Sequence, residues 1–195
     1  RKIGYYISKM RSTIIVPLSG KGSRFPREKW HLCKPLILVD SRTIIEWSMS
    51  CIDYTDCDLV FVVRKDDVEE FAIDAFLKEK FPGAEVVVIS DITRGAVETC
   101  LAAKKFIKPD APVIIHCSDV WFSPKFSVAE FNCENDGCIL TFKSNSANYS
   151  YSKLDENGYI TEVAEKKVIS NNASVGIYWF KSGKDFLSAA KKMVK

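Results

Sequence analysis

The chain has 195 residues, of which 47% are hydrophobic and 27% charged, a composition that excludes disordered and collagen-like proteins. A chain of this length buries roughly 70% of the surface it exposes when unfolded, so it can build a sizeable core without covalent cross-links. The seven cysteines are an odd number without C-x-x-C spacing, which argues against a disulfide framework and against a zinc site. We expect reduced thiols, most of them in the core.

The net charge of +3 is concentrated in one short segment. Between positions 21 and 34 a single acidic side chain, Glu28, accompanies five basic ones, which are Lys21, Arg24, Arg27, Lys29 and Lys34. That segment therefore carries +4 and the rest of the chain −1. A nucleic-acid-binding face would spread its basic residues over several elements, often with a pI above about 9. The sequence pI of 8.4 and the compact cluster favour a small polyanion as partner and no nucleic acid.

We expect no targeting signal in the N-terminal residues given. No apolar run approaches the ~20 residues that cross a bilayer, and residues 1–9 lack the apolar stretch of ~7–15 residues of a secretory signal. We therefore expect no membrane contact and a cytoplasmic location. Met10 resembles a natural start, so residues 1–10 are expected to be a leader or linker and residues 11–195 a single domain.

Short β-branched apolar runs alternate with stretches of helical periodicity up to about residue 120. Strands are expected at 13–18, 59–63, 85–89 and 113–117, and helices at 44–54, 66–80 and 95–107. This alternation predicts an α/β fold in three layers, with a mostly parallel, Rossmann-like sheet covered on both faces. Such sheets bind ligands at the carboxyl ends of their strands, so the chemistry is expected there.

After about residue 135 the pattern becomes that of antiparallel strands. A strand is expected at 138–143, a hairpin of 149–154 and 159–163 around the turn 155–158, a strand at 174–180 and a helix at 183–194. No repeat, low-complexity tract or linker separates this part from the first. We therefore predict that the β-hairpin extends the same domain.

The first predicted strand runs directly into the sequence LSGKGSRF at residues 18–25. Two glycines spaced by one residue let backbone N–H groups approach a phosphate, and Ser23 and Arg24 add a hydroxyl and a bidentate cation. The segment is neither a Walker loop nor a dinucleotide-binding loop, because Phe25 stands where the third glycine of G-x-G-x-x-G would fall. An isolated G-x-G is equally consistent with an exposed, charged turn.

Two further side chains follow in the order that a phosphate site would need. Lys34, ten residues after Arg24 and next to Pro35, can place its ammonium over the same loop. Asp119 follows the strand 113–117, where a carboxylate can link Mg²⁺ to substrate phosphates. Taken alone, Lys34 is typical of a solvated lysine and Asp119 of a turn or helix cap. His116 is expected in the core or in support of the site, and His31 in a loop.

In this order the motifs resemble those of the sugar-phosphate nucleotidyltransferases, whose GT-A-like fold is shared with nucleotide-sugar-dependent glycosyltransferases. The family's glycine-rich loop and its K-P-[LM] motif stand here as LSGKGSRF and KPLI. Further matches are RGAVET at 94–99, like the base-binding region, CSD at 117–119, like the metal motif, and VAEKK at 163–167, like E-K-P. The resemblance extends from residue 13 to about residue 180.

The resemblance implies a role for each matched position. It implies catalysis by Arg24, Lys34 and Asp119, with Asp119 binding Mg²⁺ and Lys34 reaching the α-phosphate. Acceptor binding is implied for Glu165, Lys166 and Gly176. The positions implied in nucleotide binding are Leu18, Ser19, Gly20, Lys21, Gly22, Ser23, Gly95, Ala96 and Glu98.

The implied reaction joins a nucleoside triphosphate, with CTP preferred, to a phosphorylated small molecule and releases pyrophosphate, as in capsule or surface-polysaccharide biosynthesis. Lys167 replaces the family's proline, which leaves the acceptor open between a sugar phosphate and a phosphorylated alcohol or amine. Family members generally add a second metal-binding aspartate from a later strand. We therefore expect either that the domain is truncated at its C-terminus or that a partner completes the site. A second copy of the chain in a homo-oligomer is one such partner.

Two other interpretations stay open from the residues alone. A regulatory module of the same fold would bind a nucleotide without catalysis, in keeping with the missing second carboxylate. A glycosyltransferase of related fold usually has a D-x-D metal motif, which residues 118–121, SDVW, lack. Nucleotidyl transfer is therefore the leading interpretation.

Overall fold

The computed structural model describes residues 10–194 except 21, 23, 24, 26, 132 and 133. An eight-stranded sheet runs through these residues in the order β11-β10-β12-β7-β1-β5-β6, and β9 also pairs with β12. The four strands of its parallel part are β1 (Ser12–Pro17), β5 (Cys57–Arg64), β6 (Glu85–Ile89) and β7 (Val113–His116). These are the four strands expected from the β-branched runs, which confirms the α/β prediction.

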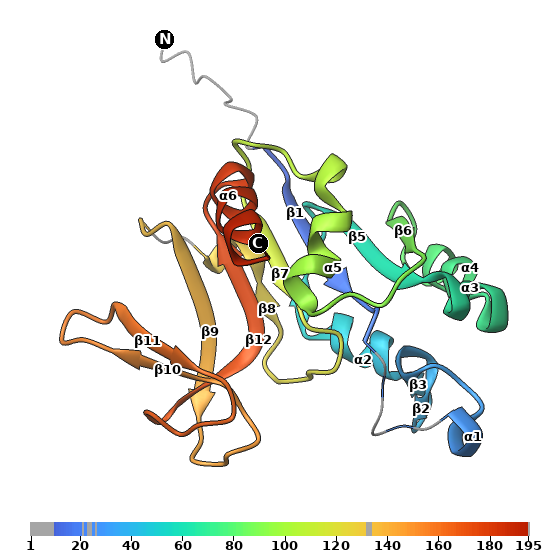
Figure 1. Ribbon diagram of the computed structural model, residues 1–195, viewed down its shortest axis with the longest axis horizontal. Helices are drawn as coiled ribbons and strands as arrows, with labels where there is room; N and C mark the ends of the chain where they lie inside the picture. The colour runs from blue at the N-terminus through green and yellow to red at the C-terminus, as the bar shows by residue number, and fades with distance from the viewer. Residues whose placement is uncertain (1–9, 21, 23–24, 26, 132–133, 195) are drawn as a thin grey trace, which may run out of the picture.

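Helices cover both faces of this sheet, as Figure 1 shows. One face carries α2 (Ile44–Ser50), α3 (Lys65–Phe71) and α4 (Ile73–Lys80), and the other α5 (Ala96–Ala102) and α6 (Gly183–Met193). Successive side chains of β1 point to opposite faces of the sheet, so Ile14 packs in the core on the first face and Ile15 in the core on the second. Fully burying a side chain of this size contributes roughly 1.5–3 kcal/mol.

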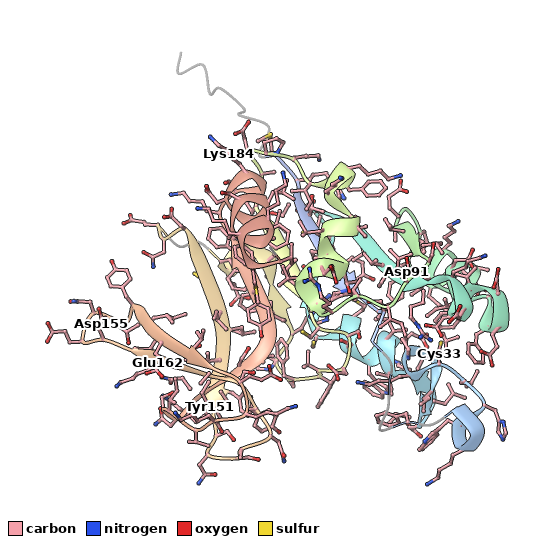
Figure 2. All side chains as sticks on the ribbon, in the orientation of Figure 1. Cys33, Asp91, Tyr151, Asp155, Glu162 and Lys184 are labelled. Atoms are coloured by element: carbon pink, nitrogen blue, oxygen red, sulfur yellow. The ribbon has the colours of Figure 1, made fainter. Side chains whose placement is uncertain are left out.

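The antiparallel part consists of β9 (Gly137–Lys143), β10 (Tyr151–Leu154), β11 (Ile160–Ala164) and β12 (Asn172–Phe180). β10 and β11 pair as the predicted hairpin, and Gly158 in its turn has a φ of +84°. β12 pairs with β7, β9 and β10, so it joins the two parts of the sheet. Figure 2 labels Asp155 and Glu162 on the hairpin, at the opposite end of the molecule from Cys33.

Short elements complete the chain. The helical turns are α1 (Arg27–Trp30), η1 (Lys34–Leu36), η2 (Lys104–Phe106) and η3 (Val128–Glu130). The two-residue strands are β2 (Leu38–Val39), β3 (Arg42–Thr43), β4 (Ile52–Asp53) and β8 (Phe126–Ser127). β2 pairs with β3 and β4 with β8. None of the described helices is both long and apolar enough to cross a membrane.

Three of the predicted helices differ from those found. The helix expected at 66–80 is two helices, because Ala72 lies between them in the left-handed region with φ 49° and ψ 38°. The helix expected at 44–54 ends at Ser50, since residues 52–53 pair as β4. The helix expected at 95–107 becomes the 3-10 turn η2 after Ala102. Cys51, Cys57 and Cys100 are buried, as expected for core thiols.

Candidate active site

The glycine-rich segment follows the carboxyl end of β1, and the structure describes its residues 18–20, 22 and 25. The N–H of Leu18 donates to the carbonyl of Val62 at 2.8 Å, which fixes the start of the segment beside β5. Gly22 has a φ of +59°, and a Cβ at this position would lie 3.4 Å from Cβ of Lys34. The N–H of Phe25 then donates to the carbonyl of Gly22 at 2.7 Å. Glycine therefore suits position 22 in both conformation and space. The predicted residues Lys21, Ser23 and Arg24 lie outside the described residues.

A cavity of about 600 Å³ opens at the carboxyl edge of the parallel strands, where ligands are expected in this type of sheet. Its walls are formed by the glycine-rich segment, by the segment that leads into α5, and by residues 117–119, which follow β7. The cavity brings together eight predicted site residues, which are Leu18, Ser19, Gly20, Gly22, Lys34, Gly95, Ala96 and Asp119.

Lys34 and Asp119 meet across the mouth of this cavity. Nζ of Lys34 lies 2.5 Å from Oδ2 of Asp119, although 85 residues separate them in sequence. Lys34 begins η1, where Pro35 fixes the backbone, and Asp119 follows β7. Their side chains are 21% and 40% exposed, so both remain accessible to a ligand. A cation and a carboxylate thus stand together beside the glycine-rich segment.

Three hydroxyl groups line the other end of the cavity. Oγ1 of Thr99 lies 2.6 Å from Oγ of Ser19 and 2.6 Å from Oγ1 of Thr93. Both threonine hydroxyls also donate to the carbonyl of Gly95, at 3.2 and 3.3 Å. Sequence reasoning missed Thr93 and Thr99 as site residues. Their position could have indicated them, because Thr93 directly precedes the motif RGAVET at 94–99 and Thr99 is its last residue.

Glu98 does not line the cavity. Its carboxylate accepts a hydrogen bond from the backbone N–H of Arg94 at 2.6 Å and forms an ion pair with the same residue's guanidinium at 3.1 Å. The hydrogen bond from that N–H lowers the pKa of Glu98. Arg94 in turn donates to the carbonyl of Val194 at 2.7 Å. In this structure Glu98 therefore holds Arg94 just before α5, and Arg94 links this segment to the end of α6.

The three predicted acceptor residues lie away from the cavity wall. The side chains of Glu165 and Lys166 are 76% and 72% exposed and lie 3.6 Å apart. Gly176 has a φ of +92°, its carbonyl accepts from the N–H of Cys117 at 2.9 Å, and a Cβ there would lie 3.0 Å from Cβ of Cys117. Glycine at 176 thus permits the close approach of β12 to the end of β7, two residues before Asp119.

His116 is fully buried beneath the site, as expected for a supporting residue. Its Nε2 lies 3.0 Å from Oγ and 3.1 Å from the carbonyl oxygen of Ser48 on α2. Burial lowers the pKa of His116 to about 4, so the ring is neutral near pH 7. The ring therefore anchors the end of β7 to α2 and is no general base for a ligand in the cavity.

The described residues include no group of three or more His, Cys, Asp or Glu side chains that could hold a metal ion on their own. Asp119 offers a single carboxylate beside the glycine-rich segment. Mg²⁺ usually binds one or two carboxylates together with phosphate oxygens and water. The residues present therefore fit a magnesium ion that is held jointly with a bound polyphosphate.

Comparisons with solved structures show the same fold in three enzymes. A nucleoside-diphosphate-sugar pyrophosphorylase from Vibrio cholerae RC9 is 24% identical, with a TM-score of 0.79 over 93% of this chain and 78% of that one. A putative glucose-1-phosphate thymidylyltransferase from Bacillus anthracis is 22% identical, with a TM-score of 0.74 over 94% and 76%. The inositol-1-phosphate CTP transferase from T. maritima is 17% identical, with a TM-score of 0.71 over 92% and 73%.

A comparison with curated protein sequences finds no match. The family model described as nucleotidyl transferase matches residues 15–194, which include both walls of the cavity and the antiparallel strands. The chain therefore belongs to the nucleotidyl transferase family, as its resemblance to the sugar-phosphate nucleotidyltransferases predicted.

Proposed function

We propose that the protein transfers a nucleotidyl group from a nucleoside triphosphate to a small phosphorylated acceptor. The observation that carries this proposal is the meeting of Lys34 and Asp119, 2.5 Å apart, at the mouth of the cavity bounded by the glycine-rich segment. A triphosphate needs backbone N–H groups, a cation and a carboxylate for its metal ion, and these groups occur together here.

The reaction is an in-line displacement. An oxygen of the acceptor phosphate forms a bond to the α-phosphorus, while the bond from that phosphorus to the bridging oxygen of the β-phosphate breaks. The electron pair leaves with pyrophosphate. Because a phosphate monoester is already ionised near pH 7, no general base is needed, in keeping with the neutral, buried His116. Lys34 and Arg24 would hold the α-phosphate and the departing phosphates in line and offset their charge.

Asp119 would bind Mg²⁺ together with the triphosphate oxygens. A bound magnesium ion would supply charge neutralisation at the phosphates. In this arrangement Lys34 exchanges its ion pair with Asp119 for contact with the α-phosphate. Gly20 and Gly22 would direct backbone N–H groups to the outer phosphates, and Gly95 and Ala96 would line the base and ribose beside the three hydroxyl groups.

The proposed substrates are a nucleoside triphosphate and a phosphorylated acceptor. CTP is the first nucleotide to test, as used by the inositol-1-phosphate CTP transferase of the same fold. The acceptor is a sugar phosphate or another small phosphorylated molecule. Glu165, Lys166 and Gly176 are candidates for its binding on the family resemblance alone, since none of them lines the cavity. We further propose that the protein acts in surface-polysaccharide biosynthesis in the cytoplasm. We also propose that it assembles as a homo-oligomer.

The experiment is a pyrophosphate-release assay of the full chain with Mg²⁺, four nucleoside triphosphates and a panel of phosphorylated acceptors. We expect release with CTP and at least one acceptor. Lys34→Ala should lower the rate by about 10²-fold, the effect of losing one preorganised group worth roughly 3 kcal/mol. Arg24→Ala should also lower the rate of pyrophosphate release. Lys29→Ala is the matched control, because this exposed lysine of the same segment does not line the cavity.

Near-normal release by Lys34→Ala, with the fold verified by circular dichroism, would contradict the role of this residue. Thermal stabilisation by nucleotide without pyrophosphate release from any acceptor would instead support the regulatory module of the same fold.

A further inference from the structure

A buried ion pair lies at the carboxyl end of β5, beside the glycine-rich segment. Nε of Arg64 donates to Oδ2 of Asp67 and Nη2 donates to Oδ1, both at 3.1 Å. The two side chains are only 10% and 4% exposed. The hydrogen bonds with Asp67 raise the pKa of Arg64, so the guanidinium is charged near pH 7. The proposed reaction uses neither residue.

The register of the sheet places Arg64 next to the glycine-rich segment. Pro17, the last residue of β1, pairs with Val62, and the N–H of Leu18 donates to the carbonyl of Val62. β5 continues for two more residues, so Arg64 stands where β1 has ended and the glycine-rich segment has begun. On its other side Arg64 pairs with Ile89 of β6. The guanidinium therefore extends from a fixed point of the sheet beside this segment.

The ion pair and the glycine-rich segment share the wall of a small space of about 20 Å³. Gly20, Gly22 and Lys34 line this space together with Arg64 and Asp67. A space of this size holds about one water molecule and no substrate. The same glycines and Lys34 also line the 600 Å³ cavity, whereas Arg64 and Asp67 do not. The ion pair can therefore influence a bound nucleotide only through the glycine-rich segment and Lys34.

Stability alone does not account for this ion pair. Two buried charges lose their hydration, and their mutual attraction only about offsets that loss. Apolar side chains of similar volume at such positions often give an equally stable or more stable fold. An apolar pair cannot supply direction, because only the bidentate contact fixes a guanidinium and a carboxylate in one geometry. A surface of fixed geometry suits a neighbouring segment whose backbone N–H groups must point at phosphates.

Building on the proposed function, we infer that Arg64 and Asp67 are positioning residues, which hold the glycine-rich segment and Lys34 in the arrangement that binds the triphosphate. Glycines at positions 20 and 22 let the backbone approach the phosphates, but they also let it adopt other conformations. The ion pair restricts this freedom before the nucleotide binds, so less ordering remains to oppose binding. Its effect is confined to the phosphates, since the base and ribose are proposed to bind at the wall that leads into α5.

The experiment uses three probes that report on different parts of the site. Inorganic tripolyphosphate with Mg²⁺ probes the phosphate-binding part alone, cytidine probes the base-binding part alone, and CTP with Mg²⁺ probes both. NMR titration of the full chain gives the three dissociation constants. The urea midpoint of unfolding is measured for every variant, so that a loss of stability is seen separately from a loss of binding.

The main variant replaces the ion pair by an apolar pair, Arg64→Met with Asp67→Leu. We expect a urea midpoint equal to or above that of the unchanged chain. The dissociation constants of tripolyphosphate and of CTP should both rise about tenfold, and that of cytidine should not change. The matched control is Lys65→Met with Glu69→Leu, an ion pair of α3 that is 3.3 Å long and 59% and 63% exposed. The control should change none of the three constants.

Asp67→Asn separates positioning from direct contact of Arg64 with the phosphates. If Arg64 were itself a phosphate ligand, loss of the Asp67 carboxylate would release its guanidinium and tighten the binding of tripolyphosphate. In a positioning pair the same substitution removes the partner that fixes the guanidinium, so we expect weaker binding. The uncompensated charge of Arg64 should also lower the urea midpoint. Equal or tighter binding of tripolyphosphate by Asp67→Asn would overturn the inference.

The apolar variant offers two further outcomes against the inference. Unchanged dissociation constants in Arg64→Met with Asp67→Leu would overturn it and leave the proposed function intact. Weaker binding of all three ligands together with a lower urea midpoint would also overturn it, because the pair would then only stabilise the fold. If the unchanged chain binds neither tripolyphosphate nor CTP and releases no pyrophosphate with any acceptor, the proposed function fails, and the inference fails with it.

Discussion

His116 lies three residues before Asp119, yet its surroundings keep it out of acid–base chemistry. It is fully buried and contacts Ser48, and in the described part of the chain its Nδ1 has no hydrogen-bond partner. A charged ring there would lose its hydration without compensation. The folded state is therefore more stable when the imidazole of His116 is neutral than when it is protonated.

This coupling predicts a pH-dependent stability. The pKa of His116 is lowered from 6.5 to about 4 on folding, so between these values the unfolded chain binds more protons than the folded one. The contribution of neutral His116 to the free energy of unfolding is complete above about pH 6.5 and is lost as the pH falls toward 4. Its total is on the order of 3 kcal/mol. Urea unfolding at pH 7.5, 6 and 5 measures it. His116→Gln should flatten the pH dependence, and His31→Gln, at an exposed loop position, should not. An unchanged slope in His116→Gln would contradict this origin.

At the same scale, the sequence allowed part of the site to be predicted. Asp119 could be identified because it follows β7 at the carboxyl edge of the parallel strands, where ligands bind. Lys34 could be identified because the motif KPLI follows the glycine-rich segment in the order seen in the family. Thr93 and Thr99 could not, since hydroxyl residues near a turn are common and only the folded chain puts them beside Ser19. Glu98 matched its motif, but the nearby N–H and guanidinium of Arg94 attract its carboxylate.

Among the elements, the break between α3 and α4 has a local cause. Ala72 adopts φ 49° and ψ 38°, which costs a residue with a Cβ roughly 1–2 kcal/mol. The helical periodicity of Val68, Phe71 and Phe76 continues across the break, because all three side chains still pack on the same core. Periodicity also placed Ala72 and Ala75 on this apolar face, but both are exposed, so the predicted face was correct only for the three larger side chains. Periodicity could not show the interruption at Ala72.

Ala72→Gly should stabilise the protein by about 0.5–1 kcal/mol, because relief of the left-handed strain exceeds the extra entropy of glycine in the unfolded chain. The matched control is Ala75→Gly at an exposed position inside α4, which should destabilise by about 1 kcal/mol. Denaturant unfolding of both variants gives the free energies. Destabilisation by both substitutions would show that Ala72 is not strained in solution.

The short strands mark the limit of sequence reasoning for whole elements. β4 and β8 have two residues each, and neither has a periodicity that a pattern could detect. Their pairing arises from tertiary structure, since the N–H of Phe126 donates to the carbonyl of Cys51 where the chain returns past α2. The long central strands were predictable because continuous β-branched runs must be buried on both faces.

In the molecule as a whole, the two halves of the sequence share one sheet. β12 pairs with β7 of the parallel part and with β9 and β10 of the antiparallel part. Trp179 of β12 packs in the same core as Ile14 of β1. Neither part therefore retains its packing when the other unfolds.

We predict a single cooperative unfolding transition for the full chain. Tryptophan fluorescence and far-UV circular dichroism should give coincident curves in urea, because the tryptophans and the sheet belong to one folding unit. Mg²⁺ with CTP at 100 times its dissociation constant should raise the free energy of unfolding by about 2.7 kcal/mol, and both probes should report the same increase. Two separated transitions would contradict the shared core, and a shift in one probe alone would restrict binding to one half.

The close contact of Gly176 with Cys117 sets the spacing between the hairpin half and the reaction edge. The register of β12 with β9 shifts between Ser174 and Tyr178, and Gly176 lies within that interval, pressed against the last residue before Ser118 and Asp119. A side chain at position 176 would therefore push β12 away from Cys117, two residues before the proposed metal-binding carboxylate. The Cys117 side chain thus fixes the distance between β12, which belongs to the antiparallel part of the sheet, and the chain that leads from β7 to Asp119.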